Sequence, residues 1–337
     1  MLKSLQKAFK VKEVRDRLLY TFMMLVVIRI GCCLPIPGVD PSYLHDFFSN
    51  LQSSGMGFFN AITGGSFSSM SIFALSITPY ITSSIIMQLL TIAIPKLEEL
   101  QKDGEDGRKK IAEYTRYLTV GLALFESCAM AVGLGGKGLL LEDHRNVWGY
   151  LTVVAAMTAG SALLMWIGER ITDNGVGNGI SIVLLINIVS GTPQDMITLY
   201  ERFMAGKSVA VATVACIIVL AIIIAIVVFV LVLNDAERRI PVQYSKKMQG
   251  RRMIGGQSTY IPLKVNTANV IPVIFASSIM SMPVMIAQFF HVDYSTIGGK
   301  ILLALSSSNW FKPEAPAYSI GLLVYIVLVV LFAYFYT

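Results

Sequence analysis

Long apolar runs alternate with shorter polar and charged segments along this chain, and the pattern predicts helices that cross a membrane. A spanning helix needs about 20 consecutive apolar residues, and eight runs approach or exceed that length. The fifth run is short, but it can continue through polar residues toward Phe203 where protein rather than lipid surrounds it. The predicted spans are residues 18–34, 70–94, 115–133, 148–168, 179–190, 209–233, 270–290 and 318–336.

The stretch Phe47–Pro95 contains no Lys, Arg, Asp, Glu or His, whereas membrane proteins usually place charges between spans. It is too long for one spanning helix, and its first half is too polar for lipid. Residues 58–69 carry apolar side chains at helical spacing and contain a Gly-Gly break at 64–65. We therefore predict a short, half-polar helix that hinges on these glycines and acts as a plug.

The second half of this stretch predicts one wall of a pore. Ile77, Ile81 and Ile85 lie at positions i, i+4 and i+8, so they share one face of the predicted helix. Aliphatic side chains at a narrow waist resist ions by dewetting. From the residues alone, ordinary helix packing is the favoured interpretation of the same stripe.

Composition supports a protein embedded in the membrane. Of the 337 residues, 55% are hydrophobic and only 14% are charged, whereas soluble domains carry about 25% charged residues. The first span is followed by no small-residue cleavage site, so we do not expect it to be a signal peptide. The four cysteines lie within apolar runs, which favours free thiols over disulfides or metal ligands: Cys32, Cys33, Cys128 and Cys216.

The distribution of Lys and Arg predicts the orientation. With the N-terminus in the cytoplasm, the cytoplasmic segments hold 19 of the 27 Lys and Arg residues, and the external segments hold 6. Positive charge accumulates on the cytoplasmic side of membrane proteins, so the N-terminus is predicted to be inside. Residues 1–17 then form an amphipathic cytoplasmic helix, and residues 58–69 lie on the outer side.

The cytoplasmic loop 234–269 is the largest insertion between spans. Residues 239–245 alternate polar and apolar side chains, and residues 253–264 can return as a second strand, which predicts a β-hairpin. Its tip, Lys246–Arg252, is basic and suits docking to an anionic partner such as ribosomal RNA or an acidic protein face. A loop whose positive charge only sets the topology is the alternative.

Other polar features give weaker signals. The Gly-Val-Gly-Asn-Gly run at 175–179 follows a span rather than a strand, so a tight turn that starts the fifth span is favoured over a nucleotide loop. No GxxxxGK[ST] stretch is present, so nucleotide hydrolysis is not expected. Arg29 and Glu126 lie inside spans, where ionisable groups are costly and often functional. Arg29 can pair with a carboxylate or face water, and Glu126 has no assigned partner.

Five separated motifs, in unbroken order, resemble the bacterial SecY family, whose members are the channel subunit of the Sec protein translocon. The motifs are SIFAL at 71–75, ITPYI at 77–81, GVGNGIS at 175–181, RRIPVQY at 238–244 and IPVIFASS at 271–278. The resemblance runs from the N-terminus to Thr337.

The resemblance implies an all-α polytopic membrane protein, a SecY-type helical bundle of two inverted halves. Residues 18–205 correspond to the N-terminal half with transmembrane helices 1–5 and a plug at 57–69. Residues 206–337 correspond to helices 6–8 of an incomplete C-terminal half, which includes the hairpin loop. The family has ten spans, so we expect the last two, and the loop between spans 8 and 9, to be missing from this chain.

The resemblance also implies four groups of functional residues. The pore ring is expected at Ile77, Ile81, Ile85, Leu184, Ile188 and Ile274. The plug residues are expected to be Phe58, Phe59, Ile62, Gly64, Gly65 and Phe67. The lateral gate is expected to include Gln88 and Asn266. Contacts with the ribosome or the motor ATPase SecA are expected at Arg238, Arg239, Lys246, Lys247, Arg251 and Arg252.

The function implied is a protein-conducting channel that passes unfolded secretory polypeptides across the bacterial cytoplasmic (inner) membrane and releases transmembrane segments into lipid through a lateral gate. The implied partners are SecE and SecG in a heterotrimeric complex, SecA, the ribosome with its nascent chain, signal sequences and the lipid bilayer. No catalytic residue, cofactor or metal is expected. A secondary transporter of a small solute is the alternative, but it needs paired carboxylates within the membrane, and only Glu126 offers itself. A membrane-embedded enzyme is a third hypothesis, and no catalytic constellation supports it.

Overall fold

The computed structural model describes most of the chain: residues 10–40, 63–134, 138, 140–141, 145–206, 208–242, 247–249, 252–254, 259–268, 270–289, 296–306, 309–310 and 316–337. These residues form two compact units. One comprises Met1–Pro193 and Ser277–Tyr325, and the other comprises Gln194–Ala276 and Ile326–Thr337. The predicted N-terminal surface helix falls mainly on residues 1–9, which lie outside the described residues.

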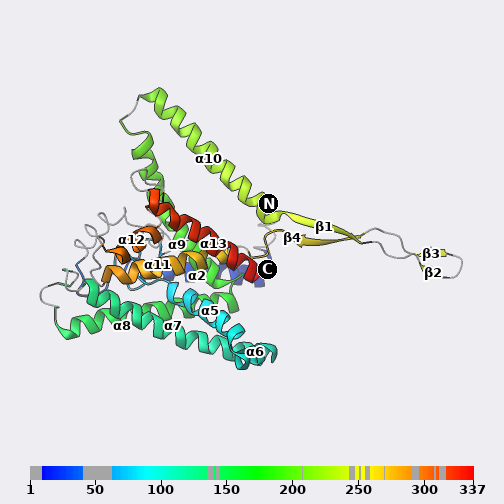
Figure 1. Cartoon of the computed structure of the whole chain (residues 1–337), viewed down its shortest axis with the longest axis horizontal. Coiled ribbons are helices and arrows are strands. Elements are labelled where there is room, and N and C mark those ends of the chain that lie inside the picture. Colours follow the sequence, from blue (N-terminus) through cyan, green and yellow to red (C-terminus); the bar gives the residue numbers. More distant parts are fainter. Residues whose placement is uncertain are drawn as a thin grey trace. The chain divides into compact units, whose positions relative to one another are not determined.

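Long helices that pack side by side make up most of the first unit. The helix α7 (Glu105–Leu134) packs against α8 (Val147–Asn174) and α5 (Thr78–Ala93), and α2 (Lys12–Cys33) packs against α8 (Figure 1). The helix α2 runs without a break through residues 17 and 18, where a boundary between a surface helix and the first span was predicted. The predicted third span, 115–133, lies inside the longer α7.

Apolar residues from these helices and from the loops between them form one core. They come from the segment after α2, the segment before α5, and the facing sides of α7 and α8. The buried members are Ile36, Val39, Phe67, Met70, Ala74, Leu75, Ala123, Met130, Ala131, Leu140, Val153 and Met157. Part of the stretch predicted to be plug and pore wall therefore belongs to the core.

The predicted second span begins eight residues later than the sequence indicated. Residues 70–77 form turns, and the helix α5 starts at Thr78 with Pro79 in its first turn. Met70 and Ser76 have φ angles of 41° and 53°, and this left-handed conformation cannot continue a right-handed helix. Proline suits the first turn because its missing N–H needs no partner there. The helical part of the predicted span 70–94 is thus Thr78–Ala93.

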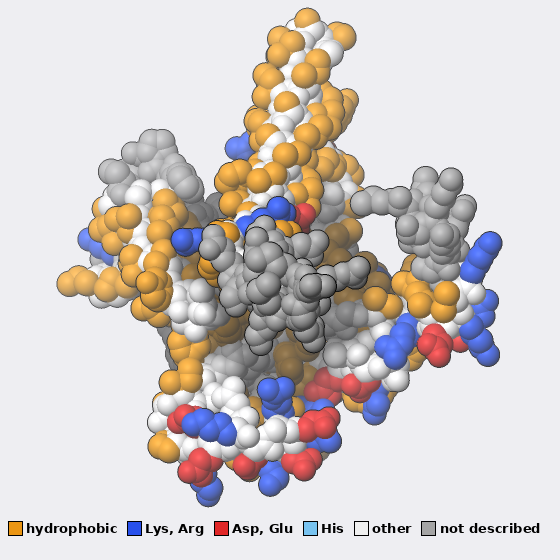
Figure 2. Space-filling view, turned by 90° about the vertical axis from the view of Figure 1, so that its right-hand side faces the viewer, with side chains coloured by type: hydrophobic (Ala, Val, Ile, Leu, Met, Phe, Trp, Pro, Cys, Tyr) orange, Lys and Arg blue, Asp and Glu red, His pale blue; other side chains and the backbone are white. Residues whose placement is uncertain are grey.

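The helix α5 ends where the chain meets a second proline. Ile94 is extended because the ring of Pro95 disfavours a helical residue before it. The short helix α6 (Pro95–Lys102) then runs at 102° to α5. Lys and Arg side chains lie among Asp and Glu side chains along the lower part of the view in Figure 2.

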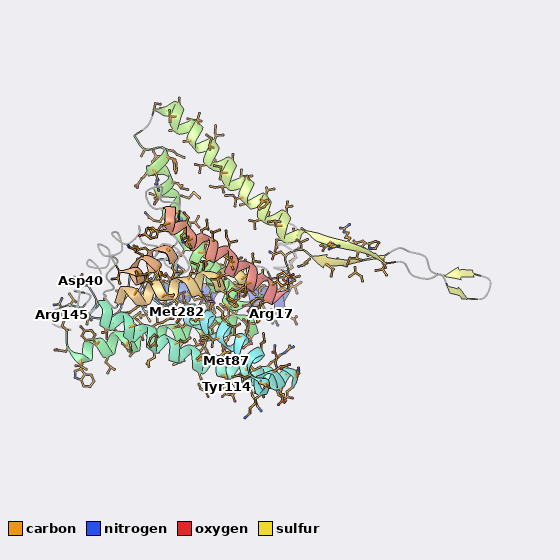
Figure 3. All side chains as sticks on the ribbon, in the orientation of Figure 1. Arg17, Asp40, Met87, Tyr114, Arg145 and Met282 are labelled. Atoms are coloured by element: carbon orange, nitrogen blue, oxygen red, sulfur yellow. The ribbon has the colours of Figure 1, made fainter. Side chains whose placement is uncertain are left out.

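A glycine-rich turn joins α8 to α9 (Gly179–Phe203), as predicted. The side chain of Asn178 caps α9, because its Oδ1 accepts hydrogen bonds from the backbone N–H groups of Ile180 and Ser181 at 3.0 and 3.3 Å. Arg17 of α2 (labelled in Figure 3) donates to the carbonyl oxygen of Gly175 at 3.4 Å. The predicted continuation of the fifth run to Phe203 is confirmed as helix, and its crossing of the membrane stays a prediction.

The end of the chain adds two longer helices and two short elements between them. These are α11 (Ile271–Phe289), α12 (Ile297–Leu305), the 3₁₀ turn η4 (Pro316–Ser319) and α13 (Ile320–Tyr336). In the first unit, Trp310 donates from Nε1 to the carbonyl oxygen of Ala304 at 2.9 Å, and its ring packs on Tyr325. In the second unit, the ring of Phe275 packs edge-on against Phe332 and Tyr336.

The second unit also contains α10 (Val209–Asp235) and the predicted hairpin. The strand β1 (Glu237–Val242) pairs antiparallel with β4 (Thr259–Lys264), with Glu237 opposite Lys264. Further along, β2 (Lys247–Gln249) pairs with β3 (Arg252–Ile254). The predicted hairpin is therefore confirmed by β1 and β4. The second pair, β2 and β3, lies where a tip at Lys246–Arg252 was predicted and was not expected from the sequence.

Within the described residues, four helices are long and apolar enough to cross a membrane: Val147–Asn174, Gly179–Phe203, Val209–Asp235 and Ala317–Tyr336. The bent pair Thr78–Ala93 and Pro95–Lys102 is a fifth candidate, and Ile271–Val284 is a shorter apolar helix. A multi-pass membrane protein follows from these lengths and compositions. The count of eight spans stays a prediction.

Candidate functional site

The isoleucine stripe lies at the start of α5 and along its first two turns. Ile77, Ile81 and Ile85 are all buried, and α5 packs against α7 and α8. Burial agrees with a closed pore ring and also with ordinary packing. The stripe alone therefore leaves both interpretations open.

The second predicted set of ring residues lies on α9, in the same unit as the stripe. Leu184 is half-buried and Ile188 is 52% exposed. Asn187, the residue before Ile188, donates from Nδ2 to Ser76 Oγ at 3.0 Å, and Ser76 directly precedes Ile77. This contact brings α9 to the start of α5. Ile77 and Ile188, which directly follow Ser76 and Asn187, therefore lie next to this contact, and the ring itself stays a prediction.

Ile274, the third predicted contribution to the ring, belongs to the part of α11 that falls in the second unit, where it is half-buried. Its place in the ring stays a prediction. The predicted gate residues are also divided between the units. Gln88 of α5 is exposed and donates to Ser84 one turn earlier at 3.5 Å, and Asn266 follows β4.

The described part of the predicted plug is residues 63–69, which continue directly into the turns before α5. We call the segment Thr63–Ser76 the plug root. Gly64 and Gly65 have φ angles of 65° and 81°, a conformation that favours glycine. Phe67, two residues later, is completely buried in the core. The predicted plug residues Phe58, Phe59 and Ile62 lie outside the described residues.

Backbone contacts fix the plug root to its surroundings. The N–H of Ile36 donates to the carbonyl of Met70, and the N–H of Ile72 donates to the carbonyl of Leu34, both at 3.0 Å. A methyl group added to Gly160 of α8 would lie 2.0 Å from the carbonyl oxygen of Ile72. The backbone of the root therefore touches α8 directly. The plug and its hinge at the glycine pair stay predictions.

Three polar residues near the root were not recognised as a group from the sequence. They are Ser76, Asn187 and Ser190, and Ser190 accepts a hydrogen bond from Arg29 Nη1 at 2.9 Å. The described partner of Arg29 is thus a hydroxyl rather than the carboxylate considered above. The only sequence signal is that Asn187 and Ser190 interrupt an apolar run at a spacing of three residues.

Glu126 of α7 is a buried carboxyl group. Glu126 is 5% exposed, and its Oε2 has no hydrogen-bond partner among the described residues. The neighbouring Ser127 is paired, since its Oγ lies 2.9 Å from Thr158 Oγ1 on α8. An unpaired buried carboxyl is costly. Nothing in this arrangement forms a paired-carboxylate ion site, and the described residues contain no cluster of three or more potential metal ligands.

The hairpin carries the basic residues predicted to contact a partner. Arg238 and Arg239 are exposed on β1, and the guanidinium of Arg239 lies 4.7 Å from the ring centre of Tyr260 on β4. This stacking orders one of the cations. Lys247 and Arg252 are placed in β2 and β3 by their backbones, whereas Lys246 and Arg251 lie outside the described residues.

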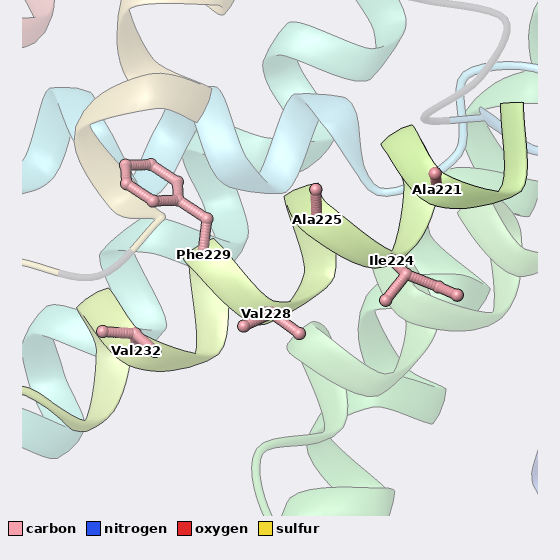
Figure 4. A pocket seen from close by; sticks show the side chains of 6 residues that line it. All are labelled: Ala221, Ile224, Ala225, Val228, Phe229 and Val232. Carbon is pink, nitrogen blue, oxygen red and sulfur yellow. The ribbon is translucent and has the colours of Figure 1, made fainter. Parts of the chain in front are cut away.

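An apolar surface depression runs along α10. It is lined by Ala221, Ile224, Ala225, Val228, Phe229 and Val232, all on this one helix (Figure 4). No polar side chain converges on it, so it lacks the groups that would fix a specific ligand. The hydrophobic side chains that cover α10 in Figure 2 are typical of a lipid-facing helix.

Comparison with known proteins decides the family. The SecY family model matches residues 71–337. The chain belongs to the SecY family. The SecY protein translocase subunit of Streptomyces scabiei is 42% identical over 348 residues, covering 100% of this chain and 76% of that protein. The SecY subunit of Escherichia coli strain K12 is 41% identical over 330 residues, covering 96% of this chain and 71% of that protein.

Solved structures share the SecY fold with this chain. A protein-conducting channel aligns with a TM-score of 0.57 at 18% identity, covering 94% of this chain and 71% of that chain. Sec61 in the canine ribosome–channel complex aligns with a TM-score of 0.59 at 18% identity, covering 97% of this chain and 76% of that chain. The mostly helical SecY-like fold with a small β-hairpin is therefore confirmed. The alternative of a secondary transporter finds no support among these relatives.

Proposed function

We propose that this chain is the channel-forming subunit of a protein translocase, which passes unfolded secretory polypeptides across the membrane. The observation that carries the proposal is the junction of α5 and α9 in a chain of the SecY family. The Asn187–Ser76 hydrogen bond joins α9 to the start of α5 beside the plug root, and Ile188 and Ile77 directly follow its two partners. This supports our assignment of the two aliphatic rows, Ile77–Ile85 and Leu184–Ile188, to one ring in a chain that matches the SecY family model. Such a junction is what a narrow apolar waist requires.

A ring of aliphatic side chains solves the main problem of such a channel. It must pass a polypeptide of any sequence and still block ions. Apolar constrictions exclude ions by dewetting, and they make no hydrogen bonds that a passing chain would have to break. Ile274 would complete this ring from α11. We assign the plug to residues 57–69, hinged at the glycine pair.

We further propose a lateral gate that uses Gln88 and Asn266 and opens to the lipid bilayer for signal sequences and transmembrane segments. Polar side chains lower the cost of wetting the seam when the gate helices separate. We assign the channel to the bacterial cytoplasmic membrane, with eight predicted spans and the N-terminus in the cytoplasm. The excess of Lys and Arg in the predicted cytoplasmic segments supports this orientation.

The partners that we propose are the small subunits SecE and SecG in a heterotrimer, the motor SecA, and the ribosome with its nascent chain. We assign no catalytic step to the chain itself, so the energy for movement comes from a partner. The solved Sec61 structure was described within a ribosome–channel complex, which is consistent with ribosome docking here.

Reconstitution tests the channel function. The full chain, with SecE, SecG and SecA, is placed in vesicles and given a precursor protein that bears a signal sequence. We expect ATP-dependent protection of the precursor from added protease, and no protection for the same precursor without its signal. Failure to protect the precursor, together with accumulation of a small solute, would support the transporter instead.

Charge reversal at the hairpin tests the docking surface. We expect Arg251→Glu with Arg252→Glu to weaken ribosome or SecA binding, and the binding of the unmodified chain to weaken as salt rises. Reversal of Lys300, which is predicted to lie on the external side, serves as the control. Equal binding by the tip variant and the control would leave the charge with a topological role only.

A further inference from the structure

The first polar contact at the pore wall joins α2 to α9. Arg29 donates from Nη1 to Ser190 Oγ at 2.9 Å, and Ser190 in turn donates to the carbonyl oxygen of Asn187 at 2.6 Å. The hydroxyl proton is used within α9, so the lone pairs of Ser190 remain available to the guanidinium. A hydrogen bond from a charged donor is stronger than one between neutral groups. Arg29 therefore holds α9 at Ser190.

The second contact joins α9 to the start of α5. Asn187 is 1% exposed and donates to Ser76 Oγ at 3.0 Å, across 111 residues of sequence. Ser76 is itself held, because its carbonyl oxygen accepts a hydrogen bond from Ser161 Oγ of α8 at 3.3 Å. Ser76 also has a left-handed φ of 53°, a conformation that only a well-fixed non-glycine residue keeps.

The third contact joins α9 to the plug root. A methyl group added to Gly64 would lie 2.8 Å from the carbonyl oxygen of Asn187 and 2.9 Å from Ser190 Oγ. The backbone of Gly64 therefore lies directly against these two residues. Its carbonyl oxygen is 3.5 Å from Ser190 Oγ. One short section of α9 is thus fixed to α2, to the start of α5 and to the plug root.

These contacts surround the predicted ring residues. Asn187 directly precedes Ile188 and lies three residues after Leu184, while Ser76 directly precedes Ile77. The Asn187–Ser76 bond therefore fixes how closely α9 approaches the residue before Ile77. Asn187 Oδ1 has no hydrogen-bond partner among the described residues, a cost that an apolar residue of similar size would avoid. The amide gives little net stability for that cost, which favours a role in positioning.

We propose that Arg29, Ser76, Asn187 and Ser190 form a polar latch that holds the pore-lining row of α9 against α5 and keeps the resting channel narrow. The proposal rests on the proposed function, because it takes Ile77, Leu184 and Ile188 as ring residues. The latch residues are positioning residues, since they act on the ring through the backbone of their helices. Opening the pore at this junction requires the latch to release.

Ion leak through the resting channel tests the latch. Vesicles that contain the full chain with its small subunits, but no SecA, are loaded with a chloride-sensitive dye. We expect Asn187→Leu and Ser190→Ala to raise the chloride leak about fivefold to tenfold, as the loss of one buried hydrogen bond of about 1 kcal/mol or more implies. Ser190→Thr keeps the hydroxyl and is expected to leak as little as the unmodified chain. Ser181→Ala, at an exposed position of α9, is the matched control.

Several outcomes overturn the latch. Leak unchanged in both Asn187→Leu and Ser190→Ala does so, and so does equal leak in Ser190→Ala and Ser190→Thr, because the hydroxyl then has no part in closure. Thermal unfolding in detergent identifies a variant that leaks because it is misfolded. In that case the latch is judged from whether Ser190→Thr, which keeps the hydroxyl, leaks as little as the unmodified chain. Precursor import by the unmodified chain is measured in the same vesicles. If the unmodified chain imports the precursor but the variants do not change the leak, only the latch is contradicted. If the unmodified chain imports no precursor, the proposed function is contradicted.

Discussion

The helices α9 and α10 follow one another along the chain and have similar lengths of 25 and 27 residues, yet their surroundings differ completely. The helix α9 buries Val183 and Asn187 and is hydrogen-bonded through Asn187 and Ser190 to distant residues. The helix α10 buries no residue, and its one hydroxyl, on Thr213, bonds to the carbonyl of Val209 one turn earlier. The hydrogen bonds of Asn187 and Ser190 thus join α9 to other helices, whereas the one hydroxyl of α10 bonds within its own helix.

The same difference separates α10 from the packed helices α5 and α8. Glycine at position 160 lets α8 touch the backbone of Ile72, and serine at position 161 reaches the backbone of Ser76. Along α10 the small residues, such as Ala221 and Ala225, only form the open depression seen in Figure 4. Matched substitutions in the two environments should therefore have different consequences.

The largest effect is expected from lysine in the isoleucine stripe. We expect Ile81→Lys to fold and to raise the resting ion leak on the order of 100-fold, if the charge lowers the barrier at the waist by about 3 kcal/mol. Chloride leak from vesicles measures it, with Ile81→Leu as the control. If the stripe only packs, the buried charge instead prevents folding. Loss of the folded protein without any leak would thus favour the packing interpretation.

The same substitution in the middle of α10 is expected to act on insertion. Lysine at the centre of a spanning helix costs about 3 kcal/mol, so Ile224→Lys should reduce the fraction of chain integrated in the membrane. Resistance to alkaline extraction measures that fraction, and Ile224→Leu is the control. Full integration of Ile224→Lys would show that α10 does not face lipid at this position.

A larger side chain is expected to destabilise the protein when it is placed in α8 but not when it is placed in α10. Gly160→Val places a branched side chain where even a methyl group would lie 2.0 Å from a backbone oxygen. We expect a loss of about 1–3 kcal/mol in the free energy of unfolding. Ala225→Val in α10 should change it little, because that surface is open. Thermal unfolding in detergent compares the two, and equal melting temperatures would contradict the packed contact at Gly160.

Replacing the buried Glu126 of α7 is expected to raise the free energy of unfolding, whereas overpacking at Gly160 lowers it. Glu126→Leu removes a buried carboxyl whose Oε2 has no described partner, and we expect the protein to be stabilised by about 1–2 kcal/mol. Ser127→Ala is the matched control, since it removes a hydroxyl that is paired with Thr158, and it should destabilise. The melting temperatures of the two variants show which is stabilised and which is destabilised. A destabilised Glu126→Leu would reveal a partner for Glu126 in the assembled complex.

Features of the fold that depend on neighbouring residues could be predicted from the sequence, whereas contacts between residues far apart in the sequence could not. The hairpin strands and the length of α9 follow from local periodicity, and both are confirmed. The start of α5 was placed at residue 70 because hydropathy cannot detect the left-handed residues Met70 and Ser76. The polar latch was missed because its hydrogen bonds join residues 111 and 161 positions apart. No local pattern records such pairs.

The smallest effect comes from exchanging one hydroxyl between the two environments. Ser161→Ala removes the hydrogen bond to the carbonyl oxygen of Ser76, and we expect a loss of about 1 kcal/mol in the free energy of unfolding. Ala225→Ser adds a hydroxyl to α10, where it can bond to the carbonyl one turn earlier and should change little. The two variants together return the amino-acid composition of the chain to its starting value. If only the position of the hydroxyl matters, the double variant melts like Ser161→Ala alone. Recovery of the original melting temperature would show that polar atoms on α10 also find partners, and the contrast between the two helices would then disappear.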